Sequence, residues 1–261
     1  MTSSNRTFAA AASLSAALLL WTAWAGAQGA LPSEATPLQI VHWAAERAGG
    51  DAWLHARTNR MEGRAELCRA GAYGQCVQAD RYVMYRVYPT SLESAHAGTG
   101  KFRLDATREG QVVFRMSYDG ERSYDQDGPI PPERAARREA SGFGFSAIRF
   151  ADQPGFTLQR LADDSVDGHP CFVLRVTDPS GSSTIFGIDQ ESAYIRLAAW
   201  DTPKGWHQRL YSDYYWVPDP GFLQPGRVRL YYAGAKEVDI RWTSATLNED
   251  IPDETFVLSG D

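Results

Sequence analysis

The chain has 261 residues, and 26 Lys and Arg against 32 Asp and Glu give a formal net charge of −6 at pH 7. An acidic chain with scattered basic residues lacks the basic surface that nucleic acids require and the polybasic segment that anionic membranes attract. We therefore expect no nucleic-acid partner. Hydrophobic residues make up 43% of the chain and aromatic residues 12%, without a low-complexity tract, which predicts a folded protein.

Residues 1–27 are typical of a cleavable secretory signal peptide. Arg6 supplies a positive start, Phe8–Trp24 is mostly apolar, and Ala25–Gly26–Ala27 has the small-x-small pattern of a cleavage site. A membrane anchor is the alternative, but the apolar stretch is short for a span and contains Ser and Thr. We predict export to the periplasm, one domain over residues 28–261, and no transmembrane segment in the mature chain.

The chain has three cysteines. Cys68 and Cys76 enclose a short loop of mostly small residues, and in an exported protein this pair predicts a disulfide at the end of a hairpin. A metal-binding pair is the alternative. Cys171 follows a turn at His169–Pro170 and opens an apolar strand, which favours a buried small side chain over a reactive thiol.

The first predicted elements after the signal peptide are helices. Leu38–Arg47 has an apolar stripe that includes Ile40, and Gly49–Gly50 ends this helix. Asp51 can cap a second, short helix over Ala52–Arg57.

Strands are predicted over most of the remaining chain, because apolar and polar residues alternate between closely spaced turns such as Asp119–Gly120 and Asp167–Gly168. Pro131–Gly142 interrupts them and predicts an inserted helix that lies over the sheet. About eleven strands without βαβ alternation favour a mainly β sandwich or barrel. The predicted strands are Asn59–Cys68, Asp80–Tyr88, Lys101–Thr107, Gln111–Tyr118, Glu121–Asp125, Phe156–Leu161, Cys171–Thr177, Thr184–Asp189, Ile195–Asp201, Trp206–Val217, Val228–Ala233 and Glu237–Leu247.

Three stretches, in this order, resemble periplasmic proteins of the LolA-like, outer membrane lipoprotein-sorting type: Ala45–Gly63, Val166–Asp189 and Ser212–Phe256. The resemblance implies an incomplete antiparallel β-barrel whose open side is covered by the N-terminal and inserted helices. It also implies a hydrophobic cavity that carries lipid or lipoprotein acyl chains in the periplasm. Members of this family often hold the lid with an Arg near the start of the second strand, and Arg81 and Arg86 are the candidates.

A curved, incomplete barrel leaves space that side chains alone rarely fill, and pockets for apolar ligands are lined by apolar side chains. The alternative is that these side chains simply pack against one another and the helices. The candidate lining residues, which strand alternation can direct inward, are Met84, Phe102, Leu104, Phe114, Met116, Phe186, Tyr214, Trp216, Leu230, Tyr232 and Trp242.

Motifs for catalysis, cofactor binding and metal binding are missing from the sequence. Gly144–Phe145–Ser146 comes nearest to a serine-nucleophile elbow but lacks the final Gly. We therefore predict no catalytic residues, no metal and no cofactor, and a hydrophobic-ligand carrier rather than an enzyme. An envelope sensor or scaffold that grips another protein is the alternative. None of the histidines has metal-site spacing, so surface or capping positions are expected for His42, His55, His96, His169 and His207.

Overall fold

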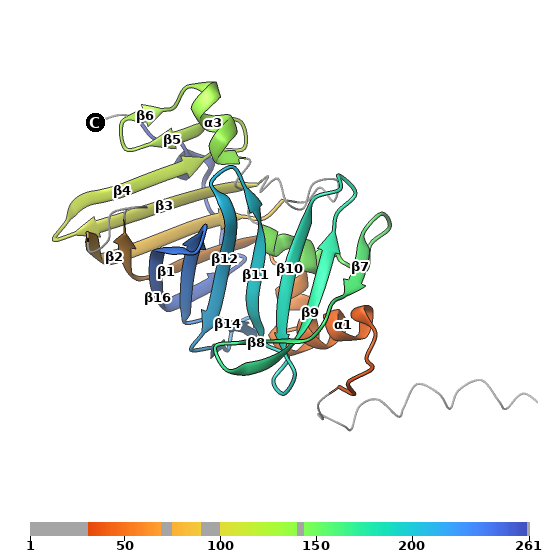
Figure 1. Ribbon diagram of the computed structural model, residues 1–261. Coiled ribbons are helices and arrows are strands. Elements are labelled where there is room, and N and C mark those ends of the chain that lie inside the picture. Colours follow the sequence, from red (N-terminus) through yellow and green to blue (C-terminus); the bar gives the residue numbers. More distant parts are fainter. Residues whose placement is uncertain (1–30, 69–74, 90–99, 140–143, 260–261) are drawn as a thin grey trace, which may run out of the picture. The chain divides into compact units, whose positions relative to one another are not determined.

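Figure 1 shows the computed structural model, which describes residues 31–68, 75–89, 100–139 and 144–259. Leu31–Asp261 cluster into one compact unit. The predicted signal peptide, residues 1–27, lies outside the described residues. No helix in the described ranges is long and apolar enough to cross a membrane.

Two helices begin the described chain, as predicted, but the second starts at Asp51 and ends at Leu54 instead of Arg57. Helix α1 spans Pro37–Ala48 and starts with a capping box at Thr36. Gly49 ends it with a φ of 127°, and a Cβ atom there would lie 2.6 Å from the carbonyl oxygen of Gly221. Only glycine allows this close approach, and α2 follows at once over Asp51–Leu54.

The strands form one large antiparallel sheet of fourteen strands and a separate hairpin. The order in the sheet is β6-β5-β4-β3-β2-β1-β16-β15-β12-β11-β10-β9-β7, and β8 pairs with β9. Its strands are β1 (Thr58–Cys68), β2 (Cys76–Val87), β3 (Lys101–Arg108), β4 (Gln111–Tyr118), β5 (Ser123–Asp125), β6 (Gly128–Pro129), β7 (Thr157–Arg160), β8 (Asp164–Val166), β9 (His169–Thr177), β10 (Ser183–Asp189), β11 (Ile195–Thr202), β12 (Gly205–Ser212), β15 (Arg227–Tyr232) and β16 (Ala235–Leu247).

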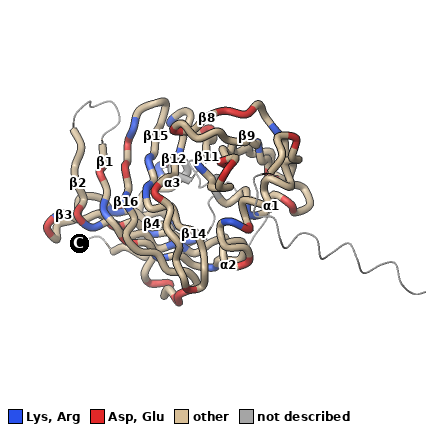
Figure 2. The backbone as a smooth tube through the Cα atoms, turned by 90° about the horizontal axis from the view of Figure 1, so that it is seen from below, with Lys and Arg blue, Asp and Glu red and all other residues tan. Residues whose placement is uncertain are grey.

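The two edges of this sheet, β6 and β7, do not pair with each other, so the barrel is incomplete as predicted. Seen from below, the strands follow a curved path, and α1, α2 and β14 lie along the side that the sheet leaves open (Figure 2). The predicted inserted helix is α3, Pro132–Glu139. It is followed by a 3-10 helix, η1 (Gly144–Phe150), that packs against β9, β10 and β11.

The predicted long strand Trp206–Val217 is wrong, because the chain breaks at Asp213. This residue has a φ of 54°, and its carbonyl oxygen accepts a hydrogen bond of 3.1 Å from the amide of Gly226. The strand therefore ends at Ser212, and β13 (Tyr215–Val217) pairs instead with β14 (Phe222–Gln224) in the separate hairpin. A short 3-10 helix, η2 (Asp253–Phe256), follows β16.

The core lies between the concave side of the sheet and the helices. Ile40 of α1 is fully buried in one cluster with Phe172, Leu174 and Phe186 of β9 and β10. Burial of each such side chain contributes about 1.5–3 kcal/mol. On β1, Gly63 allows β16 to approach so closely that a Cβ atom would lie 2.0 Å from the carbonyl oxygen of Arg241.

The predicted disulfide between Cys68 and Cys76 is confirmed, and it joins the end of β1 to the start of β2. Cys171 is the free cysteine of the chain and is buried, as predicted. Burial, together with the nearby Asp189 carboxylate, raises the pKa of its thiol to about 11. Because the thiolate is the reactive form, this thiol is unreactive in the folded protein.

A thiol count tests the pairing. After denaturation without reductant, we expect one thiol per chain to react with a thiol reagent, and three after reduction. The Cys171→Ala variant serves as the control and should give no reactive thiol without reductant. Three reactive thiols in the unreduced wild-type protein would contradict the disulfide.

Candidate ligand-binding cavity

A cavity of about 140 Å³ lies inside the curved sheet. A cavity of roughly 150 Å³ is known to admit benzene, so this one has room for a slender apolar group. Strands β1, β2, β3, β15 and β16 supply most of its wall, and residues of α2, η1, β12 and β14 complete it. The lining residues are Trp53, Asn59, Met61, Tyr82, Met84, Arg86, Tyr88, Leu104, Arg149, Arg209, Tyr211, Phe222, Leu223, Gln224, Pro225, Val228, Leu230, Ile240, Trp242 and Leu247.

Four of the residues predicted from strand alternation lie together in this wall. They are Met84 on β2, Leu104 on β3, Leu230 on β15 and Trp242 on β16. Leu104 and Trp242 are buried, whereas Met84 and Leu230 are partly exposed toward the cavity. Strands β2 and β3 from the first half of the sequence and β15 and β16 from the second half thus contribute to one apolar cavity wall.

Three more predicted residues lie on β3 and β4, outside the cavity wall. Phe102, Phe114 and Met116 are partly buried and pack against the core. Phe186 is fully buried in the core itself. These four side chains thus belong to the core and its border, not to the cavity wall.

The remaining predicted residues lie elsewhere. Tyr214 borders a smaller cavity of about 30 Å³ beside α1, and its hydroxyl donates a hydrogen bond to the carbonyl oxygen of Ile195. Tyr232 stacks on the ring of His207 at a centroid distance of 4.2 Å. Trp216 is 55% exposed, because the break at Asp213 moves β13 out of the main sheet.

The polar part of the cavity wall was not predicted. Arg86 is 7% exposed, and its Nη2 donates a hydrogen bond of 3.1 Å to Ser146 Oγ on η1. Burial, together with the positive charges of Arg149 and Arg209, lowers the pKa of Arg86 to about 10. The sequence signal was an arginine directly after the apolar run Tyr82–Tyr85 of β2. Of the two lid candidates, Arg86 contacts η1, whereas Arg81 is exposed and pairs with Glu62.

Arg149 lies on η1 and points into the same region. Its guanidinium carbon lies 4.2 Å from the ring centroid of Tyr88 and 4.9 Å from that of Trp53. Burial raises the pKa of Tyr88, but Arg149, Arg86 and a hydrogen bond from Asn59 outweigh burial, so its pKa is lowered overall. The pKa of Tyr88 is therefore lowered mainly because two positively charged arginines lie close to its ring.

His207 orients Arg209, the third arginine of the wall. The ring Nδ1 lies 2.9 Å from the carbonyl oxygen of Tyr231, and Nε2 lies 3.0 Å from Nε of Arg209. A carbonyl can only accept and a guanidinium can only donate, so the proton resides on Nδ1 and the ring is neutral. The expected surface or capping position is wrong for His207, which is fully buried against Trp200 and Tyr232.

The other described histidines do not lie in one site. His42, His55 and His169 are exposed, as predicted, and His96 lies outside the described residues. The hydroxyl of Ser146 accepts from Arg86, a cation that cannot act as a base, so the Gly144–Phe145–Ser146 stretch has no nucleophile geometry here.

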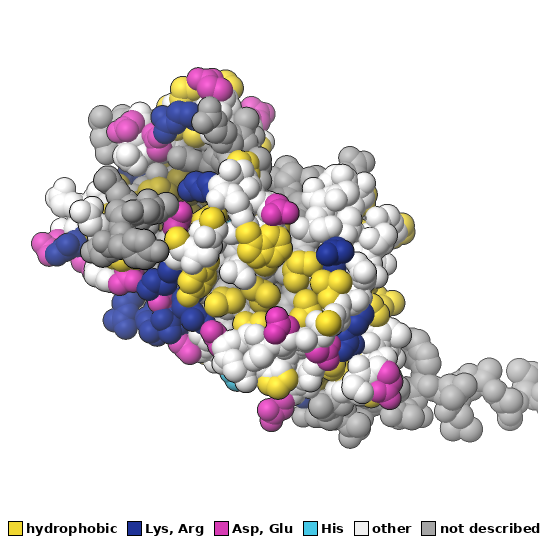
Figure 3. Space-filling view, viewed as in Figure 1, with side chains coloured by type: hydrophobic (Ala, Val, Ile, Leu, Met, Phe, Trp, Pro, Cys, Tyr) yellow, Lys and Arg dark blue, Asp and Glu magenta, His cyan; other side chains and the backbone are white. Residues whose placement is uncertain are grey.

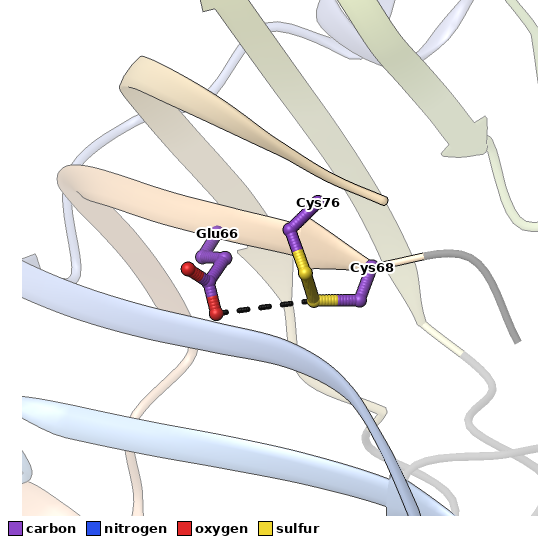
Figure 4. A group of neighbouring side chains, drawn as sticks. All are labelled: Glu66, Cys68 and Cys76. Atoms are coloured by element: carbon purple, nitrogen blue, oxygen red, sulfur yellow. Dashed lines mark hydrogen bonds between the residues drawn. A yellow bond between two sulfur atoms is a disulfide. The ribbon is translucent and has the colours of Figure 1, made fainter. Parts of the chain in front are cut away.

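One cluster of metal-ligating side-chain types occurs among the described residues, at the far end of β1 and β2. Glu66 Oε1 lies 3.8 Å from Cys68 Sγ, which is bonded to Cys76 (Figure 4). Metals bind the thiolate form of cysteine, and both sulfurs are in a disulfide. Glu66 also binds Lys236 Nζ at 2.9 Å, so this cluster cross-links strands.

Comparison with known proteins reveals the fold. No protein-family model matches the chain, and no curated protein matches it. A solved structure of a LolA superfamily protein from Nitrosomonas europaea matches over 85% of this chain and 98% of its own, with a TM-score of 0.50 and 13% sequence identity. The chain has a LolA-like fold. At this identity the likeness concerns the fold alone.

Two further structures show a similar match at slightly lower TM-scores. An outer membrane lipoprotein-sorting protein domain from Vibrio parahaemolyticus matches 84% of this LolA-like chain and 95% of its own, with a TM-score of 0.48 and 12% identity. A DUF1329 family protein from Desulfovibrio piger matches 85% of this chain and 98% of its own, with a TM-score of 0.48 and 12% identity.

The buried neutral imidazole of His207 makes stability depend on pH. Burial, together with the charge of Arg209, lowers its pKa from 6.5 to about 3. Between these values the unfolded chain binds a proton that the folded protein does not, so stability falls as pH falls from about 6.5 toward 3. We expect the free energy of unfolding to lose up to about 1.4 kcal/mol per pH unit more in wild type than in His207→Gln.

Urea unfolding curves at several pH values measure this difference. His55→Gln is the matched control, since its ring is 79% exposed, and its pH slope should equal that of wild type. Equal slopes for wild type and His207→Gln would contradict a neutral, buried His207.

Proposed function

We propose that this protein is a periplasmic binding or carrier protein for a hydrophobic ligand, either a lipid or the acyl chains of a lipoprotein. The observation that supports this most directly is the apolar cavity inside the open barrel, where Met84, Leu104, Leu230 and Trp242 meet. Concave, mostly apolar sites with a few polar groups are the usual form of small-molecule binding sites. The LolA-like fold and the disulfide suit an exported protein.

The energetics of such binding need no covalent chemistry. Each methylene that leaves water contributes about 0.8 kcal/mol, so a few buried methylenes give useful affinity. Met61 and Met84 suit ligands of variable shape, because their unbranched side chains repack easily.

A cavity-filling variant tests the proposal. Leu230→Trp places a larger ring in the wall, so we expect at least about ten-fold weaker binding of the neutral fluorescent probe N-phenyl-1-naphthylamine to delipidated protein. Val112→Trp is the control, because Val112 is 41% exposed on β4 and lies outside the wall. Absence of probe binding to the wild-type protein, or unchanged binding by Leu230→Trp, would contradict carriage in this cavity.

The second candidate is an envelope sensor or scaffold that binds another protein, and the outer face of the sheet favours it. Hydrophobic side chains gather over β10, β11 and β12 (Figure 3). Trp206 is 39% exposed there, and Ile185, Leu197 and Leu210 are half-buried. Exposed apolar patches of this kind often mark protein contacts.

The two candidates respond to different substitutions. If the protein acts by gripping a partner, Trp206→Glu should abolish cross-linking to that partner in cells and leave probe binding unchanged. If it acts as a carrier, Leu230→Trp should abolish its cellular effect, while Trp206→Glu retains it. A cellular effect that survives Leu230→Trp would rule out carriage as the function.

A further inference from the structure

Three arginines line a cavity whose wall is otherwise mostly apolar. Arg86 comes from β2, Arg149 from η1 and Arg209 from β12, so three separate elements direct positive side chains to one place. No Asp or Glu lies in the wall among the residues that the structure describes. As far as the structure describes the chain, the wall thus combines three positive side chains with no acidic one.

Arg149 leaves hydrogen-bonding capacity unused. The side chain is 8% exposed, and its buried Nε has no hydrogen-bond partner. Its guanidinium carbon lies over the ring faces of Tyr88 and Trp53, and its side chain also hydrogen-bonds Tyr88. No carboxylate within the described ranges forms an ion pair with it. A buried donor without an acceptor costs free energy, and a buried cation costs more.

A second orphaned polar atom lies in the same wall. Asn59 pairs directly with Arg86 across β1 and β2, and its side-chain Oδ1 is buried without a partner. Its Nδ2 donates to the hydroxyl of Tyr88 at 3.4 Å. Two unused polar atoms, on Asn59 and Arg149, thus lie around the same tyrosine.

The wall changes from polar to apolar along a single strand face. Arg86, Met84 and Tyr82 are alternate residues of β2 and point to the same side. Leu104 lies opposite Met84 on β3, and Trp242 packs against Tyr82 at a centroid distance of 5.4 Å. A ligand with one polar end and one apolar end would fit this wall, with its polar end near Arg86 and its apolar end near Met84 and Leu104.

We propose that the cavity binds a single-chain amphiphile with an anionic headgroup, a carboxylate or a phosphate, that the guanidinium groups of Arg86, Arg149 and Arg209 hold. This inference rests on the proposed function, because it names the ligand class for the same cavity. Guanidinium groups match the geometry of carboxylate and phosphate oxygens and are less strongly hydrated than ammonium groups. A bound anion would offset the mutual repulsion of the three arginines.

The size of the cavity limits the apolar part. About 140 Å³ suits one slender chain segment near Met84 and Leu104, and it does not suit several acyl chains side by side. The cluster also joins η1 to the sheet through Arg86 and Ser146. A purely structural role for the arginines predicts no preference among headgroups, and this difference makes the inference testable.

The decisive experiment uses delipidated wild-type protein and three ligands with the same chain: dodecanoate, dodecyl phosphate and dodecanol. Each displaces the neutral probe N-phenyl-1-naphthylamine, and the midpoint gives its affinity. We expect at least one anion to bind about ten-fold or more tightly than dodecanol, because hydrogen bonds to charged groups are the strong ones. The ratio between the two anions tells which headgroup is preferred.

Arginine variants connect the preference to the cluster. Arg149→Met should bring the ratio of anion affinity to dodecanol affinity close to one. Arg175→Met is the control, since Arg175 is exposed and contacts Gln159, and it should keep the preference. Circular dichroism and a melting curve confirm that each variant folds. If Arg149→Met does not fold, the wild-type ligand series alone decides.

Each result has one meaning. Equal binding of dodecanol and both anions overturns the headgroup inference and leaves the hydrophobic carrier in place. Failure of the neutral probe and all three ligands to bind overturns the carrier and the inference together. An anion preference that persists in Arg149→Met overturns the role of Arg149.

Discussion

The pairing of β1 with β16 is the interaction on which the rest of the structure depends. The first and last long strands of the described chain meet in the middle of the sheet, in register from Asn59 with Leu247 to Leu67 with Val238. Strands β2–β6 continue from one side of this seam and β15–β7 from the other. Without the seam, the two halves would be separate sheets, and neither would curve around a common interior.

Gly63 makes this seam possible. The register shifts next to Gly63 on both sides of β1, and β16 passes too close for any side chain. Irregularities of this type increase the local twist and bend of a strand. The bend directs the apolar faces of β2, β3, β15 and β16 toward one another, and the resulting interior is the cavity. Helix α2 and the β13–β14 hairpin then cover the open side.

The cavity differs in character from the purely apolar interior that the sequence suggested. Met84, Leu104, Leu230 and Trp242 do meet in its wall, because residues two apart on a strand share a face and adjacent strands extend that face. The arginine cluster could not be inferred in the same way. Arg86, Arg149 and Arg209 are far apart in sequence, and each taken alone is typical of a solvated residue.

The sequence by itself determined the element types, the turn positions and the disulfide pair, since these follow from local alternation, from Gly and Asp in turns and from a short cysteine loop. It also indicated the incomplete LolA-like barrel, through the resemblance. Only the tertiary structure decided the break at Asp213, the burial of His207 and the side chains that reach the cavity. The physical reason is that these features depend on contacts between strands that are far apart in the sequence. The local alternation of apolar and polar residues does not show which distant strands will meet.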